Sequence, residues 1–151
     1  MQKIRPFLWF NNNAEEAMKF YVSIFKNSKI VSTMPGPDGT VMGGTFQLEG
    51  QEFLALNGGP KYSFTPAISL FVNCETQEEV DALWNKLSAG GSEDQCGWLK
   101  DKYGLSWQII PSILGRLLGD KDRKKAQAAM QAMLQMVKID IKGLQQAYDR
   151  G

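Results

Sequence analysis

The chain of 151 residues contains no histidine. Histidine is the side chain most often used as a general base near neutral pH and the commonest ligand of transition metals. Its absence excludes Ser-His-Asp, Cys-His and histidine–metal mechanisms unless another residue takes its place. The acid–base candidates near the predicted hairpins are Glu49, Glu52, Lys100 and Asp101. None has a partner that points to a defined reaction, so the sequence leaves open whether the protein is an enzyme.

Cys74 and Cys96 are the only two cysteines. The N-terminus has no apolar signal-peptide run, and no stretch approaches the length of a membrane span. We therefore expect a cytoplasmic protein in which both thiols stay reduced. Cys96, beside Gly97 and Trp98, is a candidate pocket thiol, although a buried inert cysteine is the simpler interpretation.

Aromatic side chains recur on the segments with strand-like patterns. They could line an apolar ligand pocket, because such pockets are largely aromatic with few polar groups. Packing in the hydrophobic core explains many of them equally well, and alternation along a strand sends about half to each face. The aromatic candidates for the pocket are Phe7, Trp9, Phe46, Phe71, Trp98 and Trp107.

The composition is that of an ordinary globular domain, with 43% hydrophobic and 22% charged residues. Seventeen basic and sixteen acidic residues give a net charge of +1. This balance offers no reason to expect nucleic acid or an anionic membrane as a partner.

The chain repeats its own order of elements. A strand at 4–10, a helix and a hairpin at 45–56 are followed by a second strand at 67–73, a helix and a hairpin at 97–110. A period of about 55–65 residues occurring twice indicates a pair of modules rather than a solenoid. We expect residues 1–112 to hold two βαβββ modules, at about 3–57 and 67–111, and residues 113–151 to extend the same domain. The predicted fold class is α+β, with a curved mixed sheet forming a cup.

Helical periodicity supports one helix in each module. The first begins near a possible cap at Asn13, and the second begins with the capping-box pattern Thr76–Glu79. The first apolar stripe comprises Ala14, Ala17, Met18, Tyr21, Ile24 and Phe25. The second comprises Val80, Leu83, Trp84 and Leu87.

The tail after Pro111 is helical and rich in methionine. We expect a short helix at 113–118, a second that begins at Asp122, and a third that Asp140 caps. The second helix has an apolar face made of Ala126, Met130, Met133, Leu134 and Val137. The tail is either a cover packed on the repeated modules or a dimerisation element.

Six segments carry a family resemblance: Pro6–Phe10, Ala14–Ala17, Phe20–Tyr21, Ala55–Pro60, Cys96–Asp101 and Tyr103–Ile109. They resemble the PhnB-like branch of the vicinal oxygen chelate superfamily, which includes glyoxalase I, fosfomycin-resistance proteins, bleomycin-binding proteins and extradiol dioxygenases. The resemblance covers about residues 3–112. The tail is similar to branch members commonly labelled 3-demethylubiquinone-9 3-methyltransferase.

The resemblance implies a site inside the cup, with metal ligands on the first and last strands of each half. At the last-strand positions this chain has Gln108, where the family usually has glutamate, and Leu54; on the leading strands only Ser69 is polar. Divalent cations need anionic or imidazole donors, so we expect no metal. Gln108 and Ser69 are then the expected polar contacts of a ligand, with Leu54 and Cys96 as further pocket candidates. Gln108 is alternatively a strand residue whose amide is satisfied within the protein.

Three functions remain open. The leading hypothesis is a metal-independent glyoxalase/bleomycin-resistance-like protein that binds a small hydrophobic or aromatic molecule. If it is an enzyme, it also transforms that molecule. We expect it to be a homodimer without a cofactor. A second is a non-catalytic sequestering or interaction module. A third is the 3-demethylubiquinone-9 3-methyltransferase activity of the family label. No Gly-x-Gly-x-Gly turn joins a strand to a helix, which argues against a Rossmann-type site for S-adenosylmethionine.

Overall fold

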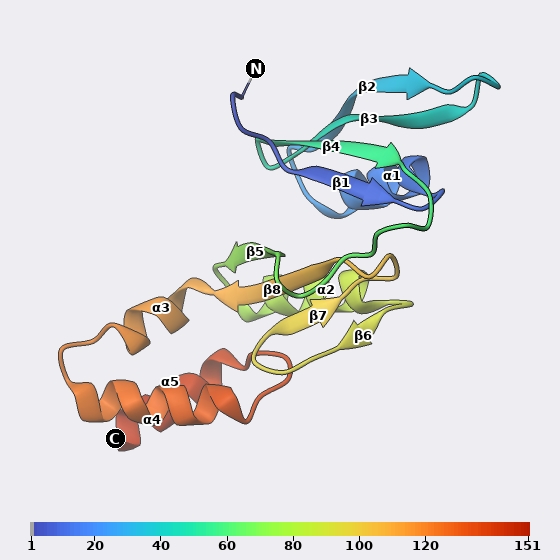
Figure 1. Cartoon of the computed structure of the whole chain (residues 1–151). Coiled ribbons are helices and arrows are strands. Elements are labelled where there is room, and N and C mark those ends of the chain that lie inside the picture. The colour runs from blue at the N-terminus through green and yellow to red at the C-terminus, as the bar shows by residue number, and fades with distance from the viewer. Residues whose placement is uncertain (1) are drawn as a thin grey trace. The chain divides into compact units, whose positions relative to one another are not determined.

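Figure 1 shows the computed structural model, which describes residues 2–151. The fold is α+β, and each module follows the order strand, helix and three strands, as the sequence predicts. The chain divides into two compact units, Met1–Phe64 and Thr65–Gly151. Each unit is described by itself.

The first unit is a four-stranded sheet with one helix. Its elements are β1 (Phe7–Phe10), α1 (Ala14–Ile24), β2 (Lys29–Pro35), β3 (Val41–Leu48) and β4 (Gln51–Asn57). The strand order is β1-β4-β3-β2, with β1 parallel to β4 and the other pairs antiparallel. Glu49 and Gly50 have φ values of 49° and 86°, as a two-residue hairpin turn with both central residues left-handed requires.

The core of this unit lies between α1 and one face of the sheet. Tyr21 of α1 stacks on Phe46 at 6.0 Å between ring centroids, and Phe46 stacks on Phe53 at 5.1 Å. The start of α1 differs from the prediction in one respect. Asn13 occupies the N-cap position without a side-chain cap bond, and Asn57 Oδ1 instead accepts the Ala14 N–H at 2.8 Å. The cap therefore comes from the end of β4.

The second unit repeats this plan. Its module contains β5 (Ser69–Cys74), α2 (Gln77–Ser88), β6 (Ser92–Glu93), β7 (Trp98–Lys100) and β8 (Ser106–Pro111), with strand order β5-β8-β7-β6. The predicted stripe of α2 is buried throughout: Val80, Leu83, Trp84 and Leu87. The predicted cap is present, because Thr76 Oγ1 accepts the Glu79 N–H at 3.2 Å; the return bond of Glu79 Oε1 goes to the N–H of Glu75, one residue before the N-cap, at 2.8 Å.

The two faces of the second sheet have different surroundings. Leu99 and Trp107 are paired across β7 and β8, are buried, and lie on the face that α2 covers. Alternation along the strands places the intervening side chains on the other face. We call this the open face; its members include Ser69, Phe71, Trp98, Gln108 and Ile110.

The tail belongs to the second unit and packs on its βαβββ module. It forms α3 (Ser112–Leu118), α4 (Arg123–Leu134) and α5 (Ile141–Arg150) (Figure 1). One apolar cluster joins the tail to the open face through Ile110 of β8. The buried members of this cluster are Ile110, Leu114, Leu117, Ala129, Ile139 and Leu144.

The buried face of α4 differs from the prediction. Ala126 and Ala129 are its buried residues, whereas Met130 and Leu134 are 36% and 43% exposed. Val137 lies beyond the end of the helix and is 40% exposed. The small side chains of Ala126 and Ala129 allow α4 to approach α5 closely, and of the larger predicted residues Met133 packs against the apolar cluster.

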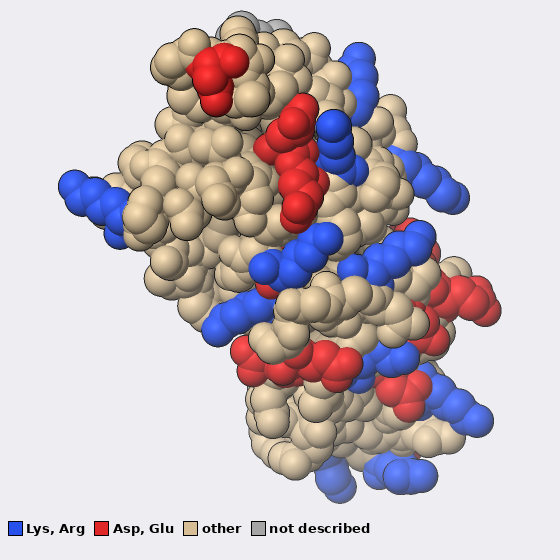
Figure 2. Space-filling model, turned by 90° about the vertical axis from the view of Figure 1, so that its right-hand side faces the viewer, with Lys and Arg blue, Asp and Glu red and all other residues tan. Residues whose placement is uncertain are grey.

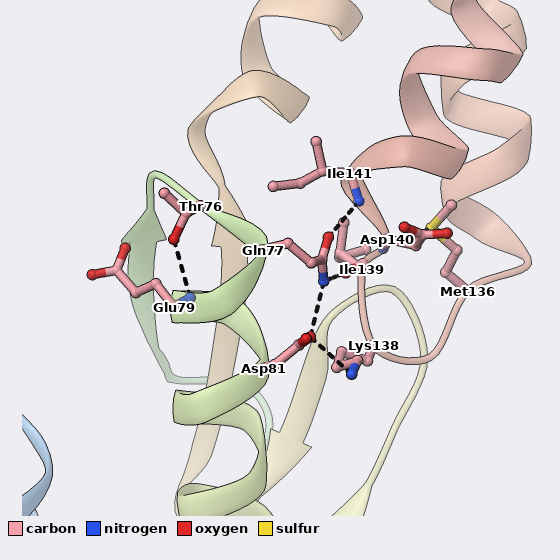
Figure 3. A network of polar contacts seen from close by, with 9 residues as sticks. All are labelled: Thr76, Gln77, Glu79, Asp81, Met136, Lys138, Ile139, Asp140 and Ile141. Atoms are coloured by element: carbon pink, nitrogen blue, oxygen red, sulfur yellow. Dashed lines mark hydrogen bonds and ion pairs between the residues drawn. The ribbon is translucent and has the colours of Figure 1, made fainter.

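A single glutamine ties the tail to α2 (Figure 3). Gln77 Oε1 accepts the Ile141 N–H at 2.8 Å, and Gln77 Nε2 donates to the Ile139 carbonyl at 3.0 Å. Asp140 sits at the N-cap of α5 without a side-chain cap bond, so Gln77 supplies the cap that was expected from Asp140. Beside it, Lys138 Nζ lies 2.8 Å from Asp81 Oδ1, and hydrogen bonds from Lys138 and Gln77 lower the pKa of the Asp81 carboxyl.

The surface drawn in Figure 2 carries both signs of charge, with Lys and Arg side chains lying among Asp and Glu side chains. Within residues 2–151, no helix combines the length and the apolar character needed to cross a membrane.

Candidate functional site

The open face of the second sheet and the tail together form a cavity of about 300 Å³. We call it the second-sheet cavity. Its walls combine strand residues with residues from α3 and α4. The lining residues are Phe71, Cys96, Trp98, Gln108, Ile110, Leu114, Gly115, Leu118 and Met133.

Gln108 is the polar anchor of this cavity. Its Nε2 donates to Ser69 Oγ at 3.0 Å, across the parallel pair β5–β8. Its Oε1 has no donor among the side chains and backbone groups of residues 2–151, so this acceptor is available to a ligand or to water. The two polar residues that the sequence placed at the site are therefore neighbours, and one of them lines the cavity.

Cys96 reaches the cavity from a strained turn before β7. Its φ of 59° is in the left-handed region, which is uncommon for a residue other than glycine. The segment is held by two backbone bonds of 2.8 Å, from the Cys96 and Gly97 N–H groups to the carbonyls of Met136 and Val137. Cys96 is half-buried, so the expectation from the sequence that this cysteine is buried is wrong.

Cys74 has a different environment. It is fully buried at the end of β5 and is absent from the cavity wall. Burial, followed by the negative charges of Glu79 and Glu75, raises the pKa of its thiol to about 12. A thiol with such a pKa stays protonated and unreactive at neutral pH.

Trp107 lies on the α2 face and takes no part in the cavity. Its Nε1 donates to Asp101 Oδ2 at 2.9 Å, and Asp101 Oδ1 accepts the N–H groups of Tyr103 and Leu105 at 2.9 and 3.1 Å. Asp101 is only 2% exposed. This carboxylate, an acid–base candidate in the sequence, therefore shapes the β7–β8 turn instead.

The candidates in the first unit lie on that unit's own sheet. Phe46 is buried against α1, whereas Phe7, Trp9 and Leu54 alternate onto the opposite face. Trp9 Nε1 donates to the Gly59 carbonyl at 2.9 Å. None of these residues lines the second-sheet cavity.

Sequence reasoning missed the contribution of the tail to this cavity. Of the nine lining residues, Leu114, Gly115, Leu118 and Met133 come from α3 and α4. The apolar spacing of Leu114, Leu118 and Met133 was visible in the sequence, but it predicted only that the helices pack against other parts of the protein. No local signal indicates which sheet face receives them.

The fold and the cavity define a two-module α+β protein with a largely apolar cavity on one sheet. A model of the 3-demethylubiquinone-9 3-methyltransferase family matches residues 2–110. The chain therefore belongs to this family. The match ends before α3, so the expected likeness of the tail to this family finds no support in it.

Solved structures agree with this assignment. The chain is 43% identical to a PhnB protein from Bacillus cereus described as a 3-demethylubiquinone-9 3-methyltransferase; the match covers 74% of this chain and 100% of that one, with a TM-score of 0.69. Two more distant structures share the fold alone. A glyoxylase/bleomycin resistance protein/dioxygenase domain from Frankia sp. is 16% identical over 74% of this chain and 92% of that one, with a TM-score of 0.51.

The other distant structure is the fosfomycin resistance protein FosX from Listeria monocytogenes, complexed with Mn(II) and sulfate. It is 15% identical over 71% of this chain and 89% of that one, with a TM-score of 0.50. No curated protein matches the chain.

A divalent metal does not fit the donor set that this chain presents. At the positions where the sequence resemblance implies metal ligands, the second unit offers the Gln108 amide and the Ser69 hydroxyl, which bond to each other. In residues 2–151, no three His, Cys, Asp or Glu side chains come together as a set that could hold an ion. Neutral amide and hydroxyl groups do not replace the anionic or imidazole ligands that such ions require.

Proposed function

We propose that this protein binds a small, largely apolar molecule in the second-sheet cavity without a metal ion. One observation carries the proposal: a cavity of about 300 Å³ whose walls are mainly aliphatic and aromatic and whose one side-chain amide, that of Gln108, is fixed by Ser69. Small-molecule sites have this composition, since apolar walls supply affinity and a few polar groups supply orientation.

Binding is better supported than acid–base catalysis. None of the nine lining residues carries a carboxylate, an amine or a phenol. Glu49 and Glu52 lie in the first unit, and Asp101 is committed to the β7–β8 turn. A reaction in this cavity would have to proceed without a protein base, apart from the thiol of Cys96.

The methyltransferase activity in the family's description has no comparable support from this chain. The glycines with positive φ serve turns and helix ends, such as Gly50 between β3 and β4 and Gly90 after α2. None lies between a strand and a helix as the phosphate-binding turn of a Rossmann site does.

Phe71 and Phe7 offer a matched test of where a ligand binds. Each lies on the leading strand of its unit, where Phe71 pairs with Gln108 of β8 and Phe7 with Leu54 of β4, and they are 54% and 56% exposed. Only Phe71 lines the cavity. We expect calorimetry with 2-naphthol, a small aromatic probe with one hydroxyl, to show binding to the wild type that Phe71→Ala weakens and Phe7→Ala leaves unchanged.

Gln108→Leu tests the polar contact. This variant should bind naphthalene as the wild type does but should bind 2-naphthol more weakly, because the amide that meets the hydroxyl is gone. If wild-type protein binds neither probe, or if Phe7→Ala and Phe71→Ala weaken binding equally, the proposed site is wrong.

A further inference from the structure

Gly115 stands out among the 15 glycines of the chain, all of which lie in the described residues. It lies in the middle of α3, where glycine is unfavourable because it loses the most backbone freedom on folding. Most other glycines have a structural reason. Some have a positive φ, as Gly50 and Gly104 do, and others face backbone atoms too close for a side chain, as Gly43 and Gly91 do.

Neither reason applies to Gly115. Its φ is not in the left-handed region, and an added Cβ would meet no atom within 4 Å. No other glycine combines these two properties. Gly115 is exposed, the space in front of it is open, and it is one of the residues that line the second-sheet cavity. An unfavourable residue that leaves room in a cavity is explained if a ligand occupies that room.

The neighbours of Gly115 determine which ligands fit. Leu114 and Leu118 precede and follow it on α3, and Met133 of α4 completes this wall. Phe71 and Trp98 supply aromatic rings from the open face. The cavity is open on one side, and its volume is about twice the ~150 Å³ of a closed apolar cavity that holds one benzene molecule. A flat molecule of about two fused rings is the size that matches.

We infer that the tail selects the ligand: the second-sheet cavity takes a flat aromatic molecule of about two fused rings, which packs against the backbone of Gly115 and donates one hydrogen bond to Gln108. The inference rests on the proposed function and adds the ligand class and the residue that admits it. The selecting wall lies entirely after residue 110, where the family match ends.

The test compares Gly115→Ala and Gly115→Leu, using phenol and 2-naphthol as probes in calorimetry on the full chain. Gly115→Ala should melt at the wild-type temperature or higher, because alanine favours the helix. Gly115→Leu should weaken 2-naphthol binding by about tenfold or more, since its side chain fills the space that the second ring needs. Phenol binding should change less, because one ring still fits.

An independent measurement does not depend on the folding of Gly115→Leu. In wild-type protein labelled with ¹⁵N, 2-naphthol should shift the amide resonance of Gly115 more than that of Gly119, which closes the same helix outside the cavity wall. If 2-naphthol binds and neither Gly115→Leu nor the Gly115 resonance responds, the inference is overturned while the proposed function stands. If no aromatic probe binds to wild type, both fail.

Discussion

Replacing Asp101 with alanine should destabilise the second unit strongly. The carboxylate is buried and accepts the N–H groups of Tyr103 and Leu105 and the indole N–H of Trp107. Two of these three donors belong to residues that are 1% and 2% exposed, Leu105 and Trp107. Water cannot easily replace the lost acceptor at such donors.

The expected magnitude follows from these two buried donors. A buried donor that loses its partner costs about 1–3 kcal/mol, so Asp101→Ala should lower the free energy of unfolding by about 2–6 kcal/mol. Asp101→Asn keeps one acceptor oxygen for the backbone N–H groups but turns an NH₂ group toward Trp107 Nε1. It should therefore lose about 1–3 kcal/mol, less than the alanine variant.

Urea denaturation followed by circular dichroism measures these differences, with Glu93→Gln as the control for losing an exposed negative charge on β6. The control should stay within about 0.5 kcal/mol of wild type. An Asp101→Ala variant as stable as this control would show that the three bonds do not hold the β7–β8 turn, and the structural role assigned to Asp101 would be refuted.

Four further outcomes are expected. The pKa of the Cys74 thiol is about 12 in the folded protein and near 9.0 in the unfolded chain, so the free energy of unfolding should fall as pH rises above 9.0. Cys74→Ala should remove up to about 1.4 kcal/mol per pH unit of that decline. Urea titrations at several alkaline pH values measure the difference. The Ser106 hydroxyl is buried without a hydrogen-bond partner among residues 2–151, so Ser106→Ala should raise the unfolding free energy by about 1 kcal/mol, and a loss of stability would contradict this account. Gln77→Ala should lower it by about 1–2 kcal/mol, because α5 loses its cap; an unchanged melting curve would show that the cap is unimportant. Light scattering should give twice the mass of one chain if the predicted homodimer forms, and a single-chain mass at micromolar concentration would exclude it.

Signals that lie close together in the sequence predicted local structure well. The start of α2 is an example, because Thr76 and Glu79 are three residues apart and their bonds depend only on helix geometry. The start of α1 shows the opposite case. Asn57, the residue that caps it, lies 43 positions from Ala14. No local pattern could indicate that pairing.

The residues of the candidate site could also be predicted only in part from the sequence. Alternation along the strands places Trp98 and Trp107 on opposite faces of the sheet, but it does not tell which of them faces α2. The structure assigns Trp107 to the core and Trp98 to the cavity. Gly115 gave no signal at all, since a lone glycine in a short helix has many explanations until its surroundings are known. Tertiary packing, rather than residue type, decides these positions.

The bonds of Gln77 to Ile139 and Ile141 have a consequence for biosynthesis. They join residues 62 and 64 positions apart, so α5 receives its cap from a helix that the ribosome has made much earlier. A chain grows from its N-terminus, and α2 can therefore form while the last helix is still unsynthesised. Closing so long a loop comes after local structure has formed. We expect docking of α5 to follow the folding of α2, so a nascent chain halted before residue 139 would leave the Gln77 amide without its two backbone partners.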